Sequence, residues 1–422
     1  MRAEDPRQGS NRRSRPRFVA SSDALRSVRL AAAAFTLLSA AHLALSAQVP
    51  ATLGFRVRET TGIQRTQYPV RARIPLRQGA LTSPSDVRLS ANGADVPAQF
   101  SAASSWNDGS VQTLEVDFNA SLEPEEERRY QLQYGATVSP APSTARGLSV
   151  VEQSDAIQVG NLRFSRSGTP LLLSAAYRGE AIGKGRNGIA VVDDRGRRHD
   201  LTTARDATMD VLKPGPLMVA LRYSATLPID EVYRAAVEVL IEMPNSKSWV
   251  KLTANVRDPG RRLRDISLET PFAFDAFPWS WDFGTDSGTY GAFRNPGDGV
   301  LLTQTMTAAG PTGWTIQTVA KEQTRPYETS GGRQVKIAAG WGHIQDARSV
   351  VAFAVDSFGR NPGTYTVGLN GQGQASFRYA PAAPPPVHQL TVYQHFVPTP
   401  VAVGAATNPT SMLNPPVVTI DR

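Results

Sequence analysis

The stretch from residue 277 to 299, FPWSWDFGTDSGTYGAFRNPGDG, mixes aromatic and acidic side chains more densely than the rest of the sequence. Aromatic faces beside carboxylates suit a sugar ring, which presents apolar C–H faces for stacking and hydroxyl groups for hydrogen bonding. We therefore take Trp279, Trp281 and Asp282 as candidate substrate-binding residues. The alternative is a long loop that packs its aromatic rings over a sheet edge while its aspartates form turns.

Three further residues have side chains suited to acid–base chemistry. Tyr290 and Arg294 lie in the same stretch, and His343 follows a tryptophan in the short segment WGH. By residue type, Arg294, His343 and Tyr290 are candidate catalytic residues, with Arg294 as a cation, His343 as a base and Tyr290 as an acid. The alternative for His343 is a strand-edge histidine with satisfied hydrogen bonds.

The sequence offers little for metal, covalent or phosphate chemistry. It has no cysteine, which excludes disulfides, thiolate nucleophiles and cysteine-ligated metals. The four histidines after the leader form no pair with zinc-binding spacing. We expect no metal and no other cofactor; the alternative is Ca²⁺ at Asp282, Asp286 and Asp298, although their spacing matches no calcium loop. The segment GKGRNG at 183–188 lacks the Ser or Thr of a phosphate loop and predicts a turn.

These candidates lie between segments that alternate in polarity. Residues 235–243 and 250–256 carry apolar side chains at every second position, which is the period of a half-buried strand. Many such segments, separated by turn residues and without a long amphipathic helix, predict an all-β fold. The segment SSWNDGSVQTLEVDF at 104–118 predicts a hairpin, because Asn-Asp-Gly favours a turn and alternation follows it.

A stretch rich in Ala, Ser, Thr and Pro, ATVSPAPSTARG, interrupts this alternation and predicts a linker at 136–148. Before it we expect a small N-terminal β-barrel-like domain at 52–135. After it we expect a large antiparallel, supersandwich-like β-sandwich at 149–400. The Pro- and Ala-rich residues 401–422 predict an irregular C-terminal tail.

The N-terminal segment explains most of the net charge of +8. Residues 1–47 hold eight arginines and three acidic residues, which leaves a net charge of +3 for the rest of the chain. A basic start followed by an apolar, Ala-rich run predicts a signal peptide, and hence a secreted or periplasmic protein; the alternative is a membrane anchor. After the leader we expect no membrane span and no nucleic-acid partner. Arg71 and Arg73 alternate along a strand and are expected to face water.

The N-terminal segments resemble a known family. The shared pattern comprises short motifs in a fixed order: Gly62 with Arg65, Pro69-Val70, Ile74-Pro75-Leu76 before Gly79, Val96-Pro97 with Gln99, and Trp106 with Asp108-Gly109-Ser110. It is similar to the N-terminal β-domain of exo-acting rhamnogalacturonan lyases (polysaccharide lyase family 26-like). Segments 155–180, 214–227 and 247–272 resemble that family's central β-sandwich. The resemblance implies an acidic, pectin-type polysaccharide as ligand and β-elimination as the reaction. This reaction needs a cation to neutralise the carboxylate, a base to remove a proton and an acid for the leaving oxygen, for which Arg294, His343 and Tyr290 are the candidates.

Members of that family carry a further C-terminal helical toroid, and this sequence contains no counterpart to it. We therefore expect a carbohydrate-active protein that binds acidic polysaccharide or oligosaccharide, with binding favoured over autonomous lyase activity. A partner protein that supplies the missing catalytic domain is part of this expectation. The alternative is a non-catalytic structural or adhesive β-protein of the cell surface. Aromatic rings of the 277–299 stretch that are exposed in a groove would favour sugar binding, and buried rings would favour the structural role.

Overall fold

The computed structural model describes residues 50–141, 147–168, 170–175, 182–320, 323–330, 336–398 and 409–421. The predicted signal peptide and the middle of the predicted linker lie outside these residues. Strands account for 61% of the structure and helices for 2%, which confirms the all-β prediction. Within the described ranges, no helix is both long enough and apolar enough to cross a membrane.

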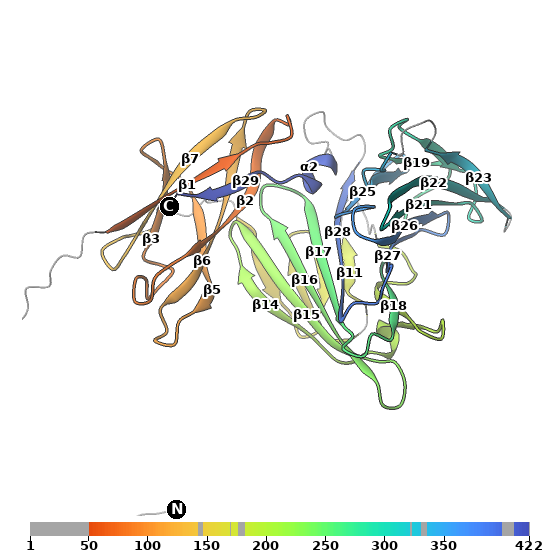
Figure 1. Cartoon of the computed structure of the whole chain (residues 1–422), viewed down its shortest axis with the longest axis horizontal. Helices are drawn as coiled ribbons and strands as arrows, with labels where there is room; N and C mark the ends of the chain where they lie inside the picture. Colours follow the sequence, from red (N-terminus) through yellow and green to blue (C-terminus); the bar gives the residue numbers. More distant parts are fainter. Residues whose placement is uncertain are drawn as a thin grey trace, which may run out of the picture. The chain divides into compact units, whose positions relative to one another are not determined.

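Two small antiparallel sheets form the N-terminal part of the chain (Figure 1). The first has the order β29-β1-β7-β3-β4 and the second the order β2-β6-β5. Their strands are β1 (Ala51–Arg58), β2 (Arg65–Pro75), β3 (Val87–Ala91), β4 (Ala94–Asp95), β5 (Ala98–Ser105), β6 (Val111–Leu122), β7 (Glu127–Tyr134) and β29 (Val417–Ile420). The two sheets share a core in which the rings of Phe55, Phe118 and Tyr130 pack together. Strands β5 and β6 pair as the hairpin expected around Asn107.

Two large antiparallel sheets share a second core and form a β-sandwich. The nine-stranded sheet has the order β14-β15-β16-β17-β28-β25-β24-β19-β20. Its strands are β14 (Arg205–Pro214), β15 (Met218–Pro228), β16 (Arg234–Pro244), β17 (Trp249–Arg257), β19 (Trp279–Phe283), β20 (Tyr290–Phe293), β24 (Trp341–Gln345), β25 (Ser349–Val355) and β28 (Val387–Pro398). The alternation expected for 235–243 is realised, because every second residue of this stretch is buried in the shared core.

The eight-stranded sheet has the order β13-β12-β18-β27-β26-β21-β22-β23. Its strands are β12 (Gly188–Asp193), β13 (Arg198–Asp200), β18 (Leu263–Pro271), β21 (Gly299–Thr307), β22 (Gly310–Ala320), β23 (Gln323–Thr329), β26 (Gly363–Asn370) and β27 (Gln374–Pro381). A small four-stranded sheet comprises β8 (Val150–Glu152), β9 (Ala156–Val159), β10 (Leu162–Ser165) and β11 (Leu172–Ala175). A single 3₁₀ turn, η1 (Leu201–Thr203), follows β13.

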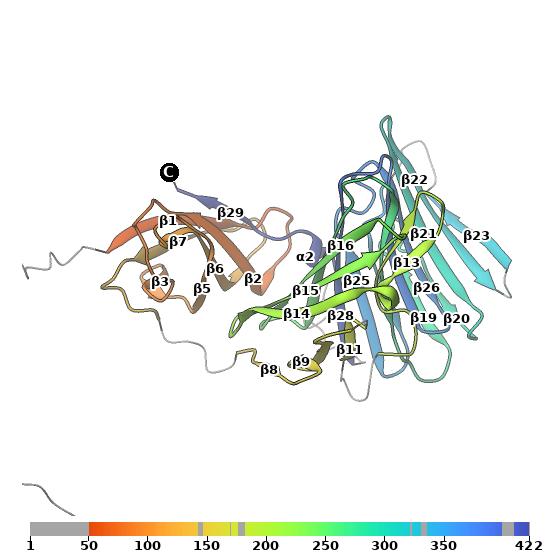
Figure 2. The same ribbon diagram turned by 90° about the horizontal axis from the view of Figure 1, so that it is seen from below.

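The prediction of an irregular C-terminal tail is wrong for its described part. Residues 409–413 form the short helix α2 (Pro409–Leu413), and β29 then pairs with β1, the first strand of the chain (Figure 2). Composition misled here because β29 is short and pairs with a strand far away in sequence. Met412 of α2 is fully buried in the N-terminal core beside Trp249 and Ala354 of the sandwich. The end of the chain therefore connects the two cores.

A buried arginine clamps this C-terminal segment. Arg65 is only 2% exposed and donates to Glu59 Oε1 at 3.0 Å. It also donates to the carbonyl oxygens of Ser411, at 3.1 Å, and Asn414, at 2.6 Å. The Tyr68 hydroxyl donates to the same Ser411 carbonyl at 2.8 Å. A buried charge is stable only when it is paired and hydrogen-bonded, so the clamp holds the segment in one position.

The expectation that Arg71 faces water is also wrong. Its Nε donates to Asp117 at 2.6 Å, and it forms an ion pair with Glu242 of the sandwich strand β16. Lys213 of β14 bridges Glu115 and Asp117, with both distances 2.6 Å. Alternation correctly assigns these side chains to one face of β2 and β6. That face is covered by the sandwich, which local sequence does not reveal.

We predict that Arg65→Ala lowers the free energy of unfolding by about 3–5 kcal/mol, because it leaves the Glu59 carboxylate buried without its cation. Arg58→Ala is the matched control, since Arg58 is exposed on β1. Urea denaturation of both variants measures the difference. Equal losses in the two variants would contradict the clamp.

We also predict a specific pH dependence for the same pair. Burial alone would raise the pKa of Glu59, but hydrogen bonds from Thr61, Glu125 and Arg65 outweigh burial and hold the pKa far below its ordinary value of 4.5. Above pH 4.5 this contribution to stability is complete, and it is lost as the pH falls towards the folded-state pKa. Glu59→Gln should therefore flatten the acid limb of a plot of unfolding free energy against pH. Glu238→Gln, on the exposed face of β16, should leave that limb unchanged.

Candidate functional site

One row of directly opposed residues crosses five neighbouring strands of the nine-stranded sheet. The successive partners, from β28 through β25, β24 and β19 to β20, are His395, Ala352, His343, Asp282 and Tyr290. Directly opposed residues of antiparallel strands point to the same face of the sheet. Three of the candidates proposed from sequence, His343, Asp282 and Tyr290, therefore share one face.

This face is the outer face of the sandwich, as the alternation along β19 shows. Trp279, Trp281 and Phe283 belong to the shared core, whereas Ser280 and Asp282 point the opposite way. The indole of Trp281 lies against Gly291, where an added Cβ would come within 2.3 Å of the ring. Because Gly291 has no side chain, the Trp281 indole can pack in the shared core, on the side of the sheet opposite the outer face.

A hollow of about 680 Å³ opens over this face. Its polar lining comes from alternate positions of three strands: Ser280, Asp282, Tyr290, His343 and Gln345. Its apolar lining includes Val350, Ala352 and Val397 on β25 and β28. Sequence reasoning did not identify Ser280 and Gln345. The signal was present, because each lies two residues along a strand from a candidate and therefore shares its face.

Asp282 and His343 form a hydrogen-bonded pair in the hollow. Oδ1 of Asp282 lies 2.8 Å from Nδ1 of His343 and accepts the His343 backbone N–H at 2.9 Å. When Asp282 is ionised and the His343 ring is neutral, Nδ1–H donates to Oδ1 and Nε2 is left as an acceptor. The side chains are 43% and 27% exposed, so both reach solvent. The pair can accept hydrogen bonds from hydroxyl groups, and His343 can accept a proton.

Tyr290 presents an exposed aromatic ring at the edge of the hollow. It is 74% exposed, while its carbonyl accepts a hydrogen bond from the Tyr327 hydroxyl at 2.8 Å. The Tyr327 ring in turn packs against Trp281, with 5.5 Å between ring centroids. The backbone of Tyr290 is thus held by Tyr327, which packs on the buried Trp281, while the Tyr290 ring extends into solvent.

His395 extends the row beneath the N-terminal part of the chain. It is 1% exposed and lies opposite Trp249, whose ring packs against Tyr68 at 5.7 Å. Burial, followed by the positive charges of His343 and Lys247, lowers the pKa of His395 to about 4. His395 is therefore neutral near pH 7. It does not line the hollow and adds no charge to it.

The remaining candidates lie elsewhere. Trp279 is a core residue whose ring stacks on Phe277 at 4.3 Å and whose Nε1 donates to the Asp275 carbonyl at 2.9 Å. Trp281 adjoins the hollow but is only 3% exposed. Neither indole offers a face for stacking, which corrects that part of the prediction. Arg294 is exposed and does not line the hollow.

The three aspartates considered for Ca²⁺ have separate partners. Asp282 pairs with His343, Asp286 binds Lys336 Nζ at 2.7 Å, and Asp298 accepts the backbone N–H of Arg294 at 2.7 Å. In the described part of the chain, no group of three or more His, Cys, Asp or Glu residues is arranged to hold a metal ion. The calcium alternative therefore has no supporting geometry among these residues.

No protein-family model and no curated protein matches the sequence. The structure is similar to that of a protein in glycosyl hydrolase family 38 from Enterococcus faecalis, with a TM-score of 0.55 and 10% identity, over 88% of this chain and 47% of that chain. It is also similar to an α-mannosidase from Enterococcus faecalis V583, with a TM-score of 0.53 and 10% identity, over 95% and 51%. The chain thus spans about half the length of these proteins. The likeness establishes the fold, and the resemblance to rhamnogalacturonan lyases stays a prediction.

We predict that Gly291→Ala destabilises the candidate site through a clash with the buried Trp281 indole. The added methyl group meets Trp281 and displaces it or the β19–β20 hairpin, at a cost of about 1–3 kcal/mol. Tryptophan fluorescence and urea denaturation measure this effect. Gly297→Ala is the control, because its nearest neighbour would be Asn295 Oδ1 at 3.3 Å on an exposed turn. If Gly291→Ala left both the fluorescence and the free energy of unfolding unchanged, the Trp281 indole would not be in contact with this backbone.

Proposed function

We propose that this protein binds carbohydrate in the hollow formed by β20, β19, β24, β25 and β28. The observation that carries the proposal is the shared face of Tyr290, Asp282 and His343, which the sheet register imposes on distant parts of the sequence. An exposed aromatic ring beside a carboxylate and an imidazole suits the amphipathic surface of a sugar. The open form of the hollow favours a polymer or oligomer that lies across it.

Each part of the hollow has a role in this proposal. The Tyr290 ring stacks on the C–H face of a sugar, and Asp282 and His343 bind its hydroxyl groups. Ser280 and Gln345 add hydrogen-bonding side chains on the same face. Val350, Ala352 and Val397 provide an apolar floor. Contact of the C–H face of a sugar with this floor removes apolar surface from water, which favours binding.

Two observations support a carbohydrate ligand. The proteins of similar fold include one in glycosyl hydrolase family 38 and one named as an α-mannosidase. The N-terminal motifs resemble those of rhamnogalacturonan lyases, which favours an acidic, pectin-type polysaccharide. The same resemblance and the apolar leader favour a secreted or periplasmic location.

Binding without turnover is the better-supported form of this function. His343, with its Nε2 lone pair, is a suitable base and Tyr290 a suitable acid for β-elimination. The lining contains no Arg or Lys to neutralise a uronate carboxylate, and Arg294 lies outside it. Elimination in this hollow would therefore need a cation from elsewhere, such as a partner protein.

The structural or adhesive alternative keeps one supporting observation. Two of the three aromatic rings that were to distinguish the hypotheses, Trp279 and Trp281, are buried in the core. The third, Tyr290, is exposed at a hollow with polar side chains around it. A purely structural surface gives no reason for this combination, and we therefore prefer carbohydrate binding.

We predict that rhamnogalacturonan I, cast in a native gel, retards the protein and that Tyr290→Ala weakens this binding about tenfold or more through loss of ring stacking. Tyr290→Phe is the matched control, since it keeps the ring and removes only the hydroxyl group. It should retain most of the retardation. The proposal would be contradicted if the polysaccharide did not retard the native protein, or if it retarded Tyr290→Ala as strongly as the native protein.

Ultraviolet absorbance of the unsaturated uronate product, followed on the same protein and polysaccharide, separates binding from elimination. We expect a flat trace. A sustained rise that His343→Ala abolishes would instead establish lyase activity in this hollow.

A further inference from the structure

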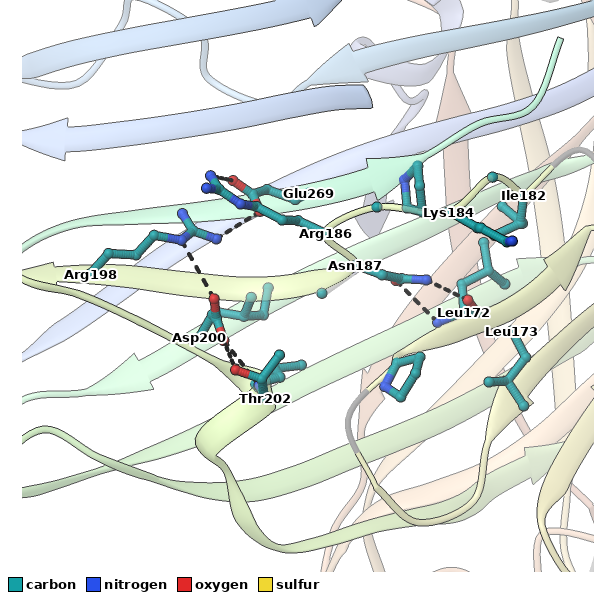
Figure 3. A pocket seen from close by; sticks show the side chains of 17 residues that line it. Leu172, Leu173, Ile182, Lys184, Arg186, Asn187, Arg198, Asp200, Thr202 and Glu269 are labelled. Atoms are coloured by element: carbon teal, nitrogen blue, oxygen red, sulfur yellow. Dashed lines mark hydrogen bonds and ion pairs between the residues drawn. The ribbon is translucent and has the colours of Figure 1, made fainter. Parts of the chain in front are cut away.

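A second hollow, of about 500 Å³, lies at the β13–β12–β18 end of the eight-stranded sheet (Figure 3). Its lining comes from β11, β12, β13, η1, β18 and the glycine-rich loop that precedes β12. This loop contains the GKGRNG segment at 183–188, for which the sequence predicted only a turn. The hollow is separate from the Tyr290 hollow, with which it shares no lining residue.

Positive charge exceeds negative charge in this hollow. Its lining holds Lys184, Arg186 and Arg198 against Asp200 and Glu269, a net charge of +1. Both guanidinium groups turn towards Glu269 in Figure 3, where Arg198 Nη2 lies 2.7 Å and Arg186 Nη1 lies 3.9 Å from the carboxylate. The single buried Glu269 cannot satisfy the donors of two guanidinium groups.

Two of the cations have free capacity. Arg186 is 66% exposed, and among the described residues its ion pair is the long contact with Glu269. Lys184 is exposed and has no ion pair or hydrogen bond to any described residue. Arg198 approaches Asp200 through Nε, but at 3.5 Å and outside hydrogen-bonding geometry. An incoming anion would therefore find donors that the protein itself leaves unused.

The backbone that carries Arg186 is held in place. Its N–H donates to Gln374 Oε1 at 2.9 Å, and its carbonyl accepts from Gln374 Nε2 at 2.9 Å. Asn187 Nδ2 donates to the Leu172 carbonyl at 2.5 Å. At Gly185 an added Cβ would lie only 2.7 Å from Gln374 Oε1, so the loop approaches this amide too closely for a side chain. A cation on a fixed backbone binds with a smaller entropy cost.

The other part of the lining is apolar. It comprises aliphatic and proline side chains: Pro170, Leu172, Leu173, Ile182, Leu201 and Pro271. A ligand that fits must therefore combine an anionic group with an apolar face. The net charge of +1 matches a monoanion such as a carboxylate better than a phosphate dianion, and the planar guanidinium fork matches the two carboxylate oxygens.

We propose that this hollow binds a carboxylate-bearing ligand of the sugar-acid class, with Arg186 and Lys184 as the principal contacts of the carboxylate and the aliphatic wall against the ring. The choice of a sugar acid rests on the proposed carbohydrate function, whereas the anion site itself rests on the charges of the hollow.

Isothermal titration calorimetry of the full chain with D-galacturonate tests the proposal. D-galactose is the matched neutral ligand, and inorganic phosphate tests the alternative anion. We expect saturable binding of galacturonate that Arg186→Ala or Lys184→Ala weakens about tenfold or more, as expected for loss of a hydrogen bond to a charged group. Arg195→Ala is the control, since Arg195 is exposed in the turn between β12 and β13 and does not line the hollow.

The proposal would be overturned if galacturonate did not bind, or if the Arg186→Ala and Lys184→Ala variants bound it as tightly as the native chain does. Binding of galactose as tight as that of galacturonate, or tighter binding of phosphate, would also overturn it. The Tyr290→Ala variant separates it from the proposed function. Galacturonate binding that persists in Tyr290→Ala and is lost in Arg186→Ala supports a second site. Binding that is lost only in Tyr290→Ala places the ligand in the first hollow and overturns this inference.

Discussion

The antiparallel register of the nine-stranded sheet is the constraint on which both the core and the candidate site depend. Because each strand alternates its side chains, fixing one pair of opposed residues fixes the face of every neighbour. The pairing of Asp282 with His343 and with Tyr290 therefore places all three outside and sends Trp281 inside. A shift of one residue would bury Asp282 and expose Trp281. The same strand register therefore buries the indoles and forms the polar hollow.

The same face serves two purposes along one row. At Trp249 it is covered by Tyr68 of the N-terminal sheets, and at Tyr290 it is open to solvent. Apolar contact alone is non-directional and would not select one placement of the N-terminal sheets on the sandwich. The buried Asp117 has specific partners on both sides, Arg71 of β2 and Lys213 of β14, and we take these ion pairs to define that placement. The C-terminal segment completes the connection by adding α2 and β29.

The two hollows differ in chemistry in a way that bears on function. The Tyr290 hollow combines an aromatic ring with a carboxylate–imidazole pair and is lined by no Lys or Arg side chain. The hollow at Arg186 combines an aliphatic wall with three cations and has no aromatic side chain. Stacking on a sugar and recognition of its carboxylate are therefore assigned to separate surfaces. This division is consistent with binding of an acidic polymer, whereas elimination requires a base and a cation at the same sugar.

The sequence by itself determined the period of the strands, the hairpin around Asn107 and the importance of the stretch from 277 to 299, because these features depend on neighbouring residues. It also identified His343, Asp282 and Tyr290 by residue type. Only the tertiary structure decided that these three share a hollow, that Trp279 and Trp281 point inwards and that Arg294 lies elsewhere. Alternation alone defines two faces but does not say which is buried, since that depends on what packs against the strand. For the same reason Arg71 meets Glu242 instead of water, and β29 pairs with a strand more than 350 residues away in sequence.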